Sequence, residues 1–122
     1  MNDKTHSLLI IDDDENTLET MEKYFRMKGY EVTSTSNGLD ALKLIEQRSD
    51  FDLIITDIVM PSVSGIAVIA VAKKLLPDVP LIAITGWGEH PEGLAWEAHA
   101  DLVVKKPVQL EKLENEALNL LK

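Results

Sequence analysis

The chain has 122 residues, of which 45% are hydrophobic and 27% charged, and its formal net charge is −9. This length suits one domain with a sizeable core, and the acidic balance argues against nucleic acid or an anionic membrane as a partner, because both require clustered Lys and Arg. The absence of cysteine excludes disulfides and thiol chemistry. No apolar stretch reaches the ~18 residues that span a bilayer, and residues 1–6 are polar, so we expect a cytoplasmic protein with a flexible N-terminal tail.

Short apolar runs alternate with longer stretches of helical periodicity along the chain. The runs predict strands over residues 8–11, 30–33, 53–56, 81–84 and 102–104. Between them, helices are expected after Asp14, from Asn37-Gly38 onward, over 66–76 and over about 91–98. A last helix, ending at Lys122, is expected from the apolar face formed by Leu110, Leu113, Ala117 and Leu120. Gly29 is a typical C-terminal stop for the first helix. The stretch 66–76 is apolar almost all round, and its length favours a helix over a strand.

Strands that are short and wholly apolar, and that alternate with helices, are typical of a parallel sheet covered on both faces. Right-handed crossovers place the carboxyl ends of all strands at one edge, which is where ligands bind in such sheets. We therefore predict an α/β fold, with a doubly wound five-stranded parallel sheet and five helices, as a single domain over residues 1–122. The polar residues expected at that edge are Asp12, Asp13, Asp57, Thr85 and Lys106.

Two of the predicted strands end in acid, the first in Asp12 and Asp13 and the third in Asp57. If these strands are neighbours, the carboxylates crowd together, and two unit charges about 4 Å apart repel by about 4 kcal/mol at an effective dielectric of about 20. A hard divalent cation commonly offsets such crowding. The alternative for the first cluster is that its acids cap the following helix, which is the interpretation we prefer for Asp14.

Four motifs, in order and at the expected spacing, resemble the receiver domain of two-component response regulators, of the chemotaxis-regulator type. They are Asp12-Asp13, Asp57 with Met60-Pro61 and Gly65, Thr85-Gly86, and Lys106-Pro107. Each motif alone is weak, but the four together are specific, and the resemblance covers essentially the whole chain. It implies a flavodoxin-like strand order, 2-1-3-4-5, and a cis bond between Lys106 and Pro107.

The resemblance also implies a role for each site residue. Asp57 matches the phosphoacceptor, which takes a phosphoryl group from a sensor histidine kinase or a histidine phosphotransfer protein. Asp13 and Asp57 match direct Mg²⁺ ligands, and Val59 matches a ligand that binds through its backbone carbonyl. Asp12 matches an acid that acts mainly through metal-bound water. Lys106 matches the lysine that pairs with the phosphoryl group, and Thr85 the switch hydroxyl.

Such a domain assists its own phosphorylation and dephosphorylation, and it is not an enzyme that turns over a small substrate. Phosphorylation is expected to change its contact with an effector domain, a partner protein or a second copy of the chain.

The family pattern is broken at Val103, where receivers usually carry Tyr or Phe. A valine has no ring to turn inward and little rotamer freedom, so we expect the signal to pass through the loop around Thr85 and the fourth helix. The resemblance implies that the positions of Trp87 and Val59 tune hydrolysis, so two apolar residues there predict slow loss of phosphate. The alternative for Trp87 is an aromatic residue that only packs on the surface of its loop. Trp96, in the fourth helix, fits either the core or a partner surface.

Two other classes of function remain as alternatives. A Mg²⁺-dependent phosphohydrolase with an aspartyl nucleophile would use a similar acid cluster, but such enzymes generally need a second domain to enclose the substrate. A flavin-binding module of the same topology would need a Ser, Thr or Gly-rich loop after the first strand. This chain has acids over residues 12–15 instead, which repel phosphate unless a metal intervenes.

Overall fold

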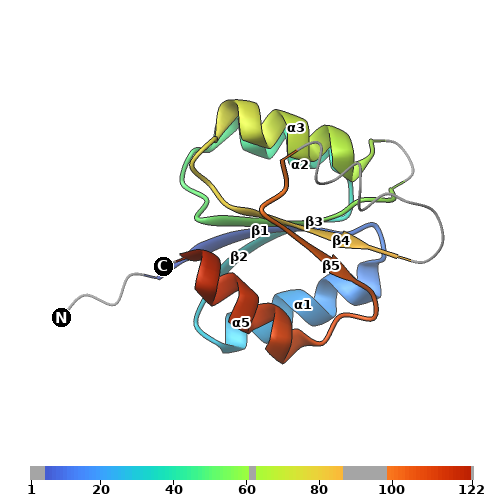
Figure 1. Ribbon diagram of the computed structural model, residues 1–122, viewed down its shortest axis with the longest axis vertical. Coiled ribbons are helices and arrows are strands. Elements are labelled where there is room, and N and C mark those ends of the chain that lie inside the picture. The colour runs from blue at the N-terminus through green and yellow to red at the C-terminus, as the bar shows by residue number, and fades with distance from the viewer. Residues whose placement is uncertain (1–4, 61–62, 87–98, 122) are drawn as a thin grey trace.

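A five-stranded parallel sheet separates two layers of helices in the computed structural model (Figure 1). The structure describes residues 5–60, 63–86 and 99–121. The strands are β1 (Ser7–Ile11), β2 (Glu31–Thr35), β3 (Leu53–Asp57), β4 (Leu81–Thr85) and β5 (Leu102–Lys105), in the order β2-β1-β3-β4-β5. The helices in the described residues are α1 (Glu15–Met27), α2 (Gly38–Gln47), α3 (Gly65–Leu75) and α5 (Leu110–Leu121). The predicted α/β class and the flavodoxin-like strand order are confirmed.

The strand register brings the polar strand ends to one level. Ile11 of β1 lies opposite Thr56 of β3, so Asp12 emerges beside Asp57. On the other side of β3, Asp57 lies opposite Ile84 of β4. The expected gathering of polar residues at the carboxyl edge therefore follows directly from the pairing of the central strands.

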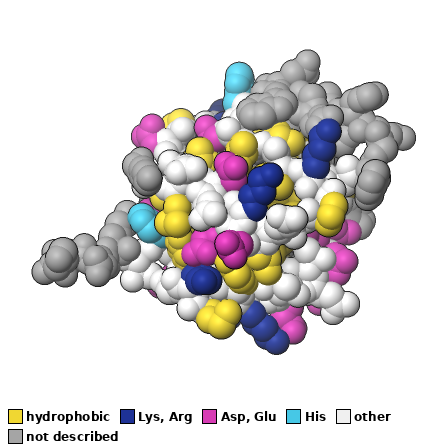
Figure 2. All heavy atoms as spheres, turned by 60° about the horizontal axis from the view of Figure 1, so that its bottom comes forward, with side chains coloured by type: hydrophobic (Ala, Val, Ile, Leu, Met, Phe, Trp, Pro, Cys, Tyr) yellow, Lys and Arg dark blue, Asp and Glu magenta, His cyan; other side chains and the backbone are white. Residues whose placement is uncertain are grey.

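The sheet has a core on each face, because successive strand residues point to opposite sides. One core holds Leu9 and Ile54 and lies under α2 and α3, and the other holds Leu8 and Ile55 and lies under α1 and α5 (Figure 1). Viewed from the side of α1 and α5, acidic, basic and hydrophobic side chains are interspersed, and Lys and Arg do not form a continuous patch on this face (Figure 2).

The helices begin at residues that satisfy their free N–H groups. Asp14 Oδ1 accepts hydrogen bonds from the N–H groups of Asn16 (3.0 Å) and Thr17 (3.3 Å), so the capping role predicted for Asp14 is confirmed. Asn37 caps α2 in the same way. Gly29, which follows α1, has a φ of 95°, a conformation that side chains rarely adopt.

The third predicted helix is confirmed, and Val68 and Ile69 bury one side of it in the core. The predicted helix over about 91–98, with Trp96, lies outside the described residues. No helix within the described ranges has the length and apolar character needed to cross a membrane.

Candidate functional site

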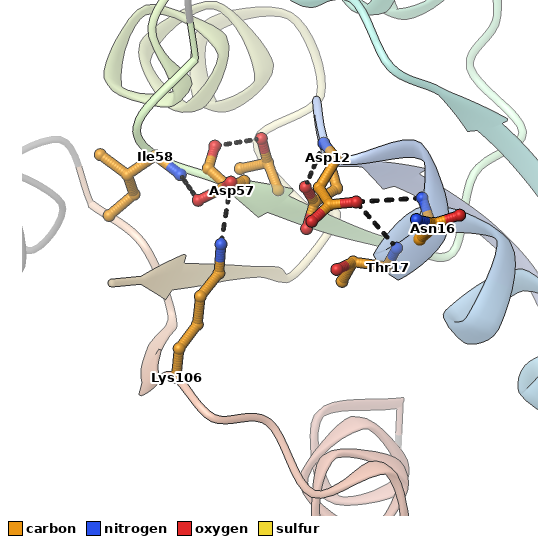
Figure 3. Close-up of polar contacts among 8 residues, drawn as sticks. Asp12, Asn16, Thr17, Asp57, Ile58 and Lys106 are labelled. Atoms are coloured by element: carbon orange, nitrogen blue, oxygen red, sulfur yellow. Dashed lines mark hydrogen bonds and ion pairs between the residues drawn. The ribbon is translucent and has the colours of Figure 1, made fainter. Parts of the chain in front are cut away.

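Three carboxylates and one lysine meet at the carboxyl edge of the sheet. Figure 3 shows two of the carboxylates, Asp12 and Asp57, together with Lys106. Asp12 and Asp13 follow β1, Asp57 ends β3, and Lys106 follows β5. Asp12 is 0% exposed and Asp57 3%, whereas Asp13 is exposed. One oxygen from each carboxylate lies within 4.8 Å of the other two. The structure therefore brings together the acids that the sequence placed at this edge.

The two oxygens of the Asp57 carboxylate have different partners. Oδ1 accepts a hydrogen bond from the N–H of Ile58 at 2.8 Å, and Oδ2 faces the Nζ of Lys106 at 3.2 Å (Figure 3). Burial raises the pKa of Asp57 above its ordinary value, while Lys106 and the Ile58 N–H oppose the rise. Asp57 is thus a buried carboxylate held in one orientation by a backbone group and a cation.

Asp12 is less well satisfied. Its Oδ1 accepts a hydrogen bond from the N–H of Asp14 at 2.9 Å, but its buried Oδ2 has no hydrogen-bond partner among the described residues. Burial raises the pKa of Asp12 to about 6, and the negative charge of Asp57 adds to the rise. A buried carboxylate oxygen without a donor is costly, so this position suits a cation.

Lys106 supplies a positive charge to this group. Burial alone would lower its pKa, but the charge of Asp57, helped by those of Asp12 and Asp13, raises the pKa overall, so the side chain stays protonated at neutral pH. Its backbone N–H donates to the carbonyl of Thr85 at 2.8 Å, which fixes the end of β5 against β4. The bond to Pro107 is cis, as the resemblance implies.

Thr85 ends β4 one position beyond Ile84, the residue that lies opposite Asp57, and its side chain is buried. Among the described residues, a Cβ on the adjacent Gly86 would meet no heavy atom within 4 Å. Val103 is half-buried and packs against the core under α2 and α3. Trp87 lies outside the described residues.

The described residues after β3 combine one exposed side chain with a tightly packed start of α3. The Val59 side chain is 66% exposed, whereas Met60 is buried. The N–H of Gly65 donates to the carbonyl of Ile58 at 2.7 Å. A Cβ on Gly65 would overlap the carbonyl oxygen of Asp57, so α3 can begin this close to the site only with glycine here.

Two groups at the site were not anticipated from the sequence. The hydroxyl of Thr56 donates a hydrogen bond to the carbonyl of Asp57 at 2.9 Å, and the N–H of Ile58 holds Asp57 Oδ1. The only sign of these contacts in the sequence is Thr56 itself, a polar residue at the end of an otherwise apolar run. Its partner could not be deduced, because that depends on the direction of the peptide that follows.

Comparison with known proteins agrees with this geometry. Residues 8–118 match the family described as the response regulator receiver domain. The chain is 40% identical over 118 residues to the response regulator SaeR of Staphylococcus epidermidis, an alignment that covers 96% of this chain and 50% of that protein. It therefore spans about half the length of the curated relatives it matches.

Solved structures show the same architecture. A response regulator receiver domain protein (CheY-like) from Methanospirillum hungatei has a TM-score of 0.91 at 28% identity, covering 97% of this chain and 94% of that one. A response regulator from Burkholderia pseudomallei, whose crystal structure contains a phosphorylated aspartic acid, a calcium ion and citrate, has a TM-score of 0.82 at 29% identity, covering 96% and 66%. The chain belongs to the response regulator receiver domain family of two-component signalling.

Proposed function

We propose that the chain accepts a phosphoryl group on Asp57 from a phosphohistidine of a sensor histidine kinase or a histidine phosphotransfer protein. The observation that carries this proposal is the environment of Asp57, a buried carboxylate with one oxygen held by a backbone N–H and the other facing a lysine. The phosphorylated aspartic acid in the Burkholderia relative supports the same chemistry.

In the transfer step, an oxygen of Asp57 attacks the phosphorus and the P–N bond of the phosphohistidine breaks. The imidazole nitrogen leaves with the bonding electron pair, and an acyl phosphate forms on Asp57. Lys106, whose Nζ lies 3.2 Å from Asp57 Oδ2, pairs with the added negative charge. The site thus exchanges a carboxylate–lysine contact for a phosphoryl–lysine contact.

The acid cluster fits Mg²⁺ as the cofactor. Asp12, Asp13 and Asp57 bring oxygens within 4.8 Å of one another, and no residue in the described ranges donates to Asp12 Oδ2. Mg²⁺ favours a few carboxylates together with retained water, so these residues, with the backbone carbonyl of Val59, would hold it. When bound, the ion would neutralise charge that develops on the transferring phosphoryl group.

The proposed output is a change in protein contact rather than turnover of a small molecule. Thr85 ends the strand next to that of Asp57 and is buried, and we expect its hydroxyl to turn toward a phosphoryl group on Asp57. With Val103 in place of an aromatic ring, backbone movement around Thr85 carries the change to a partner protein or an effector domain.

Intact mass spectrometry after incubation with acetyl phosphate and Mg²⁺ tests this function. We expect one phosphoryl group per chain, and none in Asp57→Asn or when the metal is chelated. Asp50→Asn is the matched control, because Asp50 is an exposed acid paired with Arg48, and it should be labelled like the wild type. Labelling of Asp57→Asn would refute the assignment. Release of many equivalents of phosphate from small phosphomonoesters would favour the phosphohydrolase instead.

A further inference from the structure

The peptide unit between Asp57 and Ile58 is held at both ends. Its carbonyl, on Asp57, accepts a hydrogen bond from Thr56 Oγ1 at 2.9 Å. Its N–H, on Ile58, donates to Asp57 Oδ1 at 2.8 Å and to the carbonyl of Ile84 at 3.1 Å. Because the carbonyl and the N–H of one peptide lie in one rigid plane, a group that fixes the carbonyl also fixes the direction of the N–H.

The surroundings of Thr56 suit it to fix this carbonyl. Its side chain is 0% exposed, and the residue lies level with Ile11 on β1 and Ala83 on β4. A buried hydroxyl needs a hydrogen-bond partner, and the branched side chain of threonine has few rotamers. Gly65 packs so closely against the Asp57 carbonyl that a Cβ on Gly65 would overlap the carbonyl oxygen. The peptide is therefore confined by packing as well as by the hydrogen bond.

The Ile58 N–H, in turn, decides how the carboxylate of Asp57 presents its two oxygens. While Oδ1 is held by this N–H, Oδ2 points to Lys106. Without that hydrogen bond the carboxylate would rotate more freely, since the last torsion of an aspartate is broad. A nucleophile that must meet phosphorus in line loses rate when its orientation is not fixed.

We propose that Thr56 is a positioning residue for the phosphoacceptor: its buried hydroxyl fixes the Asp57–Ile58 peptide and, through it, the orientation of the Asp57 carboxylate. The role rests on the proposed function of Asp57. Thr56 touches neither the phosphoryl donor nor Lys106 in this scheme, and it acts through the backbone alone.

Replacing Thr56 with valine removes the hydroxyl and keeps the shape, whereas serine keeps the hydroxyl. At saturating Mg²⁺, we expect Thr56→Val to be labelled by acetyl phosphate about tenfold more slowly than the wild type, and Thr56→Ser within about twofold of it. Thr33→Val is the matched control, because the hydroxyl of Thr33, which lies on β2 away from the site, accepts a hydrogen bond from Arg48. It should be labelled at the wild-type rate.

A second measurement does not depend on phosphorylation. In the NMR spectrum of the unphosphorylated protein, the amide proton of Ile58 should move upfield in Thr56→Val and exchange faster with solvent. Thr56→Ser should show neither change. If the wild type took up no label, the function proposed for Asp57 would fail, and the Ile58 amide would decide the role of Thr56. An unchanged Ile58 amide in Thr56→Val, wild-type labelling of that variant, or a Thr56→Ser variant as slow as Thr56→Val would each overturn the inference.

Discussion

The two edges of the sheet use aspartate in opposite ways. At the amino edge, Asp52 and Asp101 precede β3 and β5, and each pairs with the first residue of the neighbouring strand. Asp52 donates its N–H to the carbonyl of Ser7 (2.7 Å) and accepts the N–H of Ser7 on Oδ2 (2.8 Å). Asp101 forms the same pair of hydrogen bonds with Leu81, at 2.9 and 2.7 Å. These carboxylates extend the hydrogen bonding of the strands, which is a structural role.

At the carboxyl edge, two of the three clustered acids are deeply buried, although Asp13 is exposed. Asp12 and Asp57 are almost fully buried, and Asp12 Oδ2 has no donor among the described residues. Each edge also has a lysine, but Lys73 contacts Asp101 at 2.5 Å and the carbonyl of Val79 at 3.2 Å, whereas Lys106 interacts with the charges of three acids. The same residue types therefore stabilise the fold where their bonds are complete, and remain available to a ligand where they are not.

The largest effect is expected from adding a side chain at Gly65, where α3 packs against the carboxyl edge of the sheet. A Cβ there would overlap the carbonyl oxygen of Asp57 and come within 2.6 Å of the Cα of Ile58. Both neighbours are backbone atoms, so relief requires α3 to move. We expect Gly65→Ala to lower the free energy of unfolding by about 3 kcal/mol, measured by urea denaturation.

Gly86→Ala is the matched control for this substitution, because a Cβ on Gly86 meets no described residue within 4 Å. It should change the free energy of unfolding by less than about 0.5 kcal/mol. Equal effects at the two glycines would show that α3 is not packed against the Asp57 peptide as described.

A smaller effect is expected from neutralising Asp12. The folded protein raises the pKa of this carboxyl from 3.8 to about 6, so between these values the folded state binds more protons than the unfolded state. Ionisation of Asp12 therefore lowers the free energy of unfolding as pH rises from about 4 to about 6. Above that range the loss of stability does not increase further. The difference of about two pKa units corresponds to at most about 3 kcal/mol.

Asp12→Asn should accordingly stabilise the metal-free protein by about 2 kcal/mol at pH 7 and have little effect at pH 4. Urea denaturation in the presence of a chelator, at both pH values, measures the change. Asp101→Asn is the control at the amino edge, and it should not stabilise the protein, because its carboxylate is already bonded to Lys73 and Leu81. Equal stabilisation by both variants would mean that the two edges do not differ.

Most of the fold could be predicted from local patterns. The buried strands β1, β3 and β4 appear in the sequence as unbroken apolar runs, and each was placed to within one residue. The exception was β2, which was predicted to end at residue 33 and continues to Thr35. This strand lies at the edge of the sheet and is only partly buried, so the polar residues at its end carry no apolar signal.

The site was predictable to the level of its motifs but not of its bonds. Asp12 and Asp57 each follow or end an apolar strand, and the carboxyl ends of parallel strands lie at one edge of the sheet. The sequence therefore predicts that the two acids share that edge. Nothing local indicates that Thr56 bonds to the Asp57 carbonyl, or that Asp52 and Asp101 pair with neighbouring strands, because these contacts depend on strand register and on the direction of single peptides. Sequence patterns specify which residues share an edge, and packing specifies which atoms meet.

The smallest effects are expected from replacing the two lysines, Lys73 and Lys106. Lys73→Met should lower the free energy of unfolding by about 1 kcal/mol, because Asp101 and the Val79 carbonyl lose a cation. Lys106→Met should cost about as much in the absence of metal, but millimolar Mg²⁺ should then stabilise it by about 1 kcal/mol more than it stabilises the wild type, since the ion no longer competes with a fixed positive charge. For Lys73→Met, the stabilisation by Mg²⁺ should equal that of the wild type. Urea denaturation with and without Mg²⁺ measures both, and an equal response of the two variants would place the metal away from Lys106.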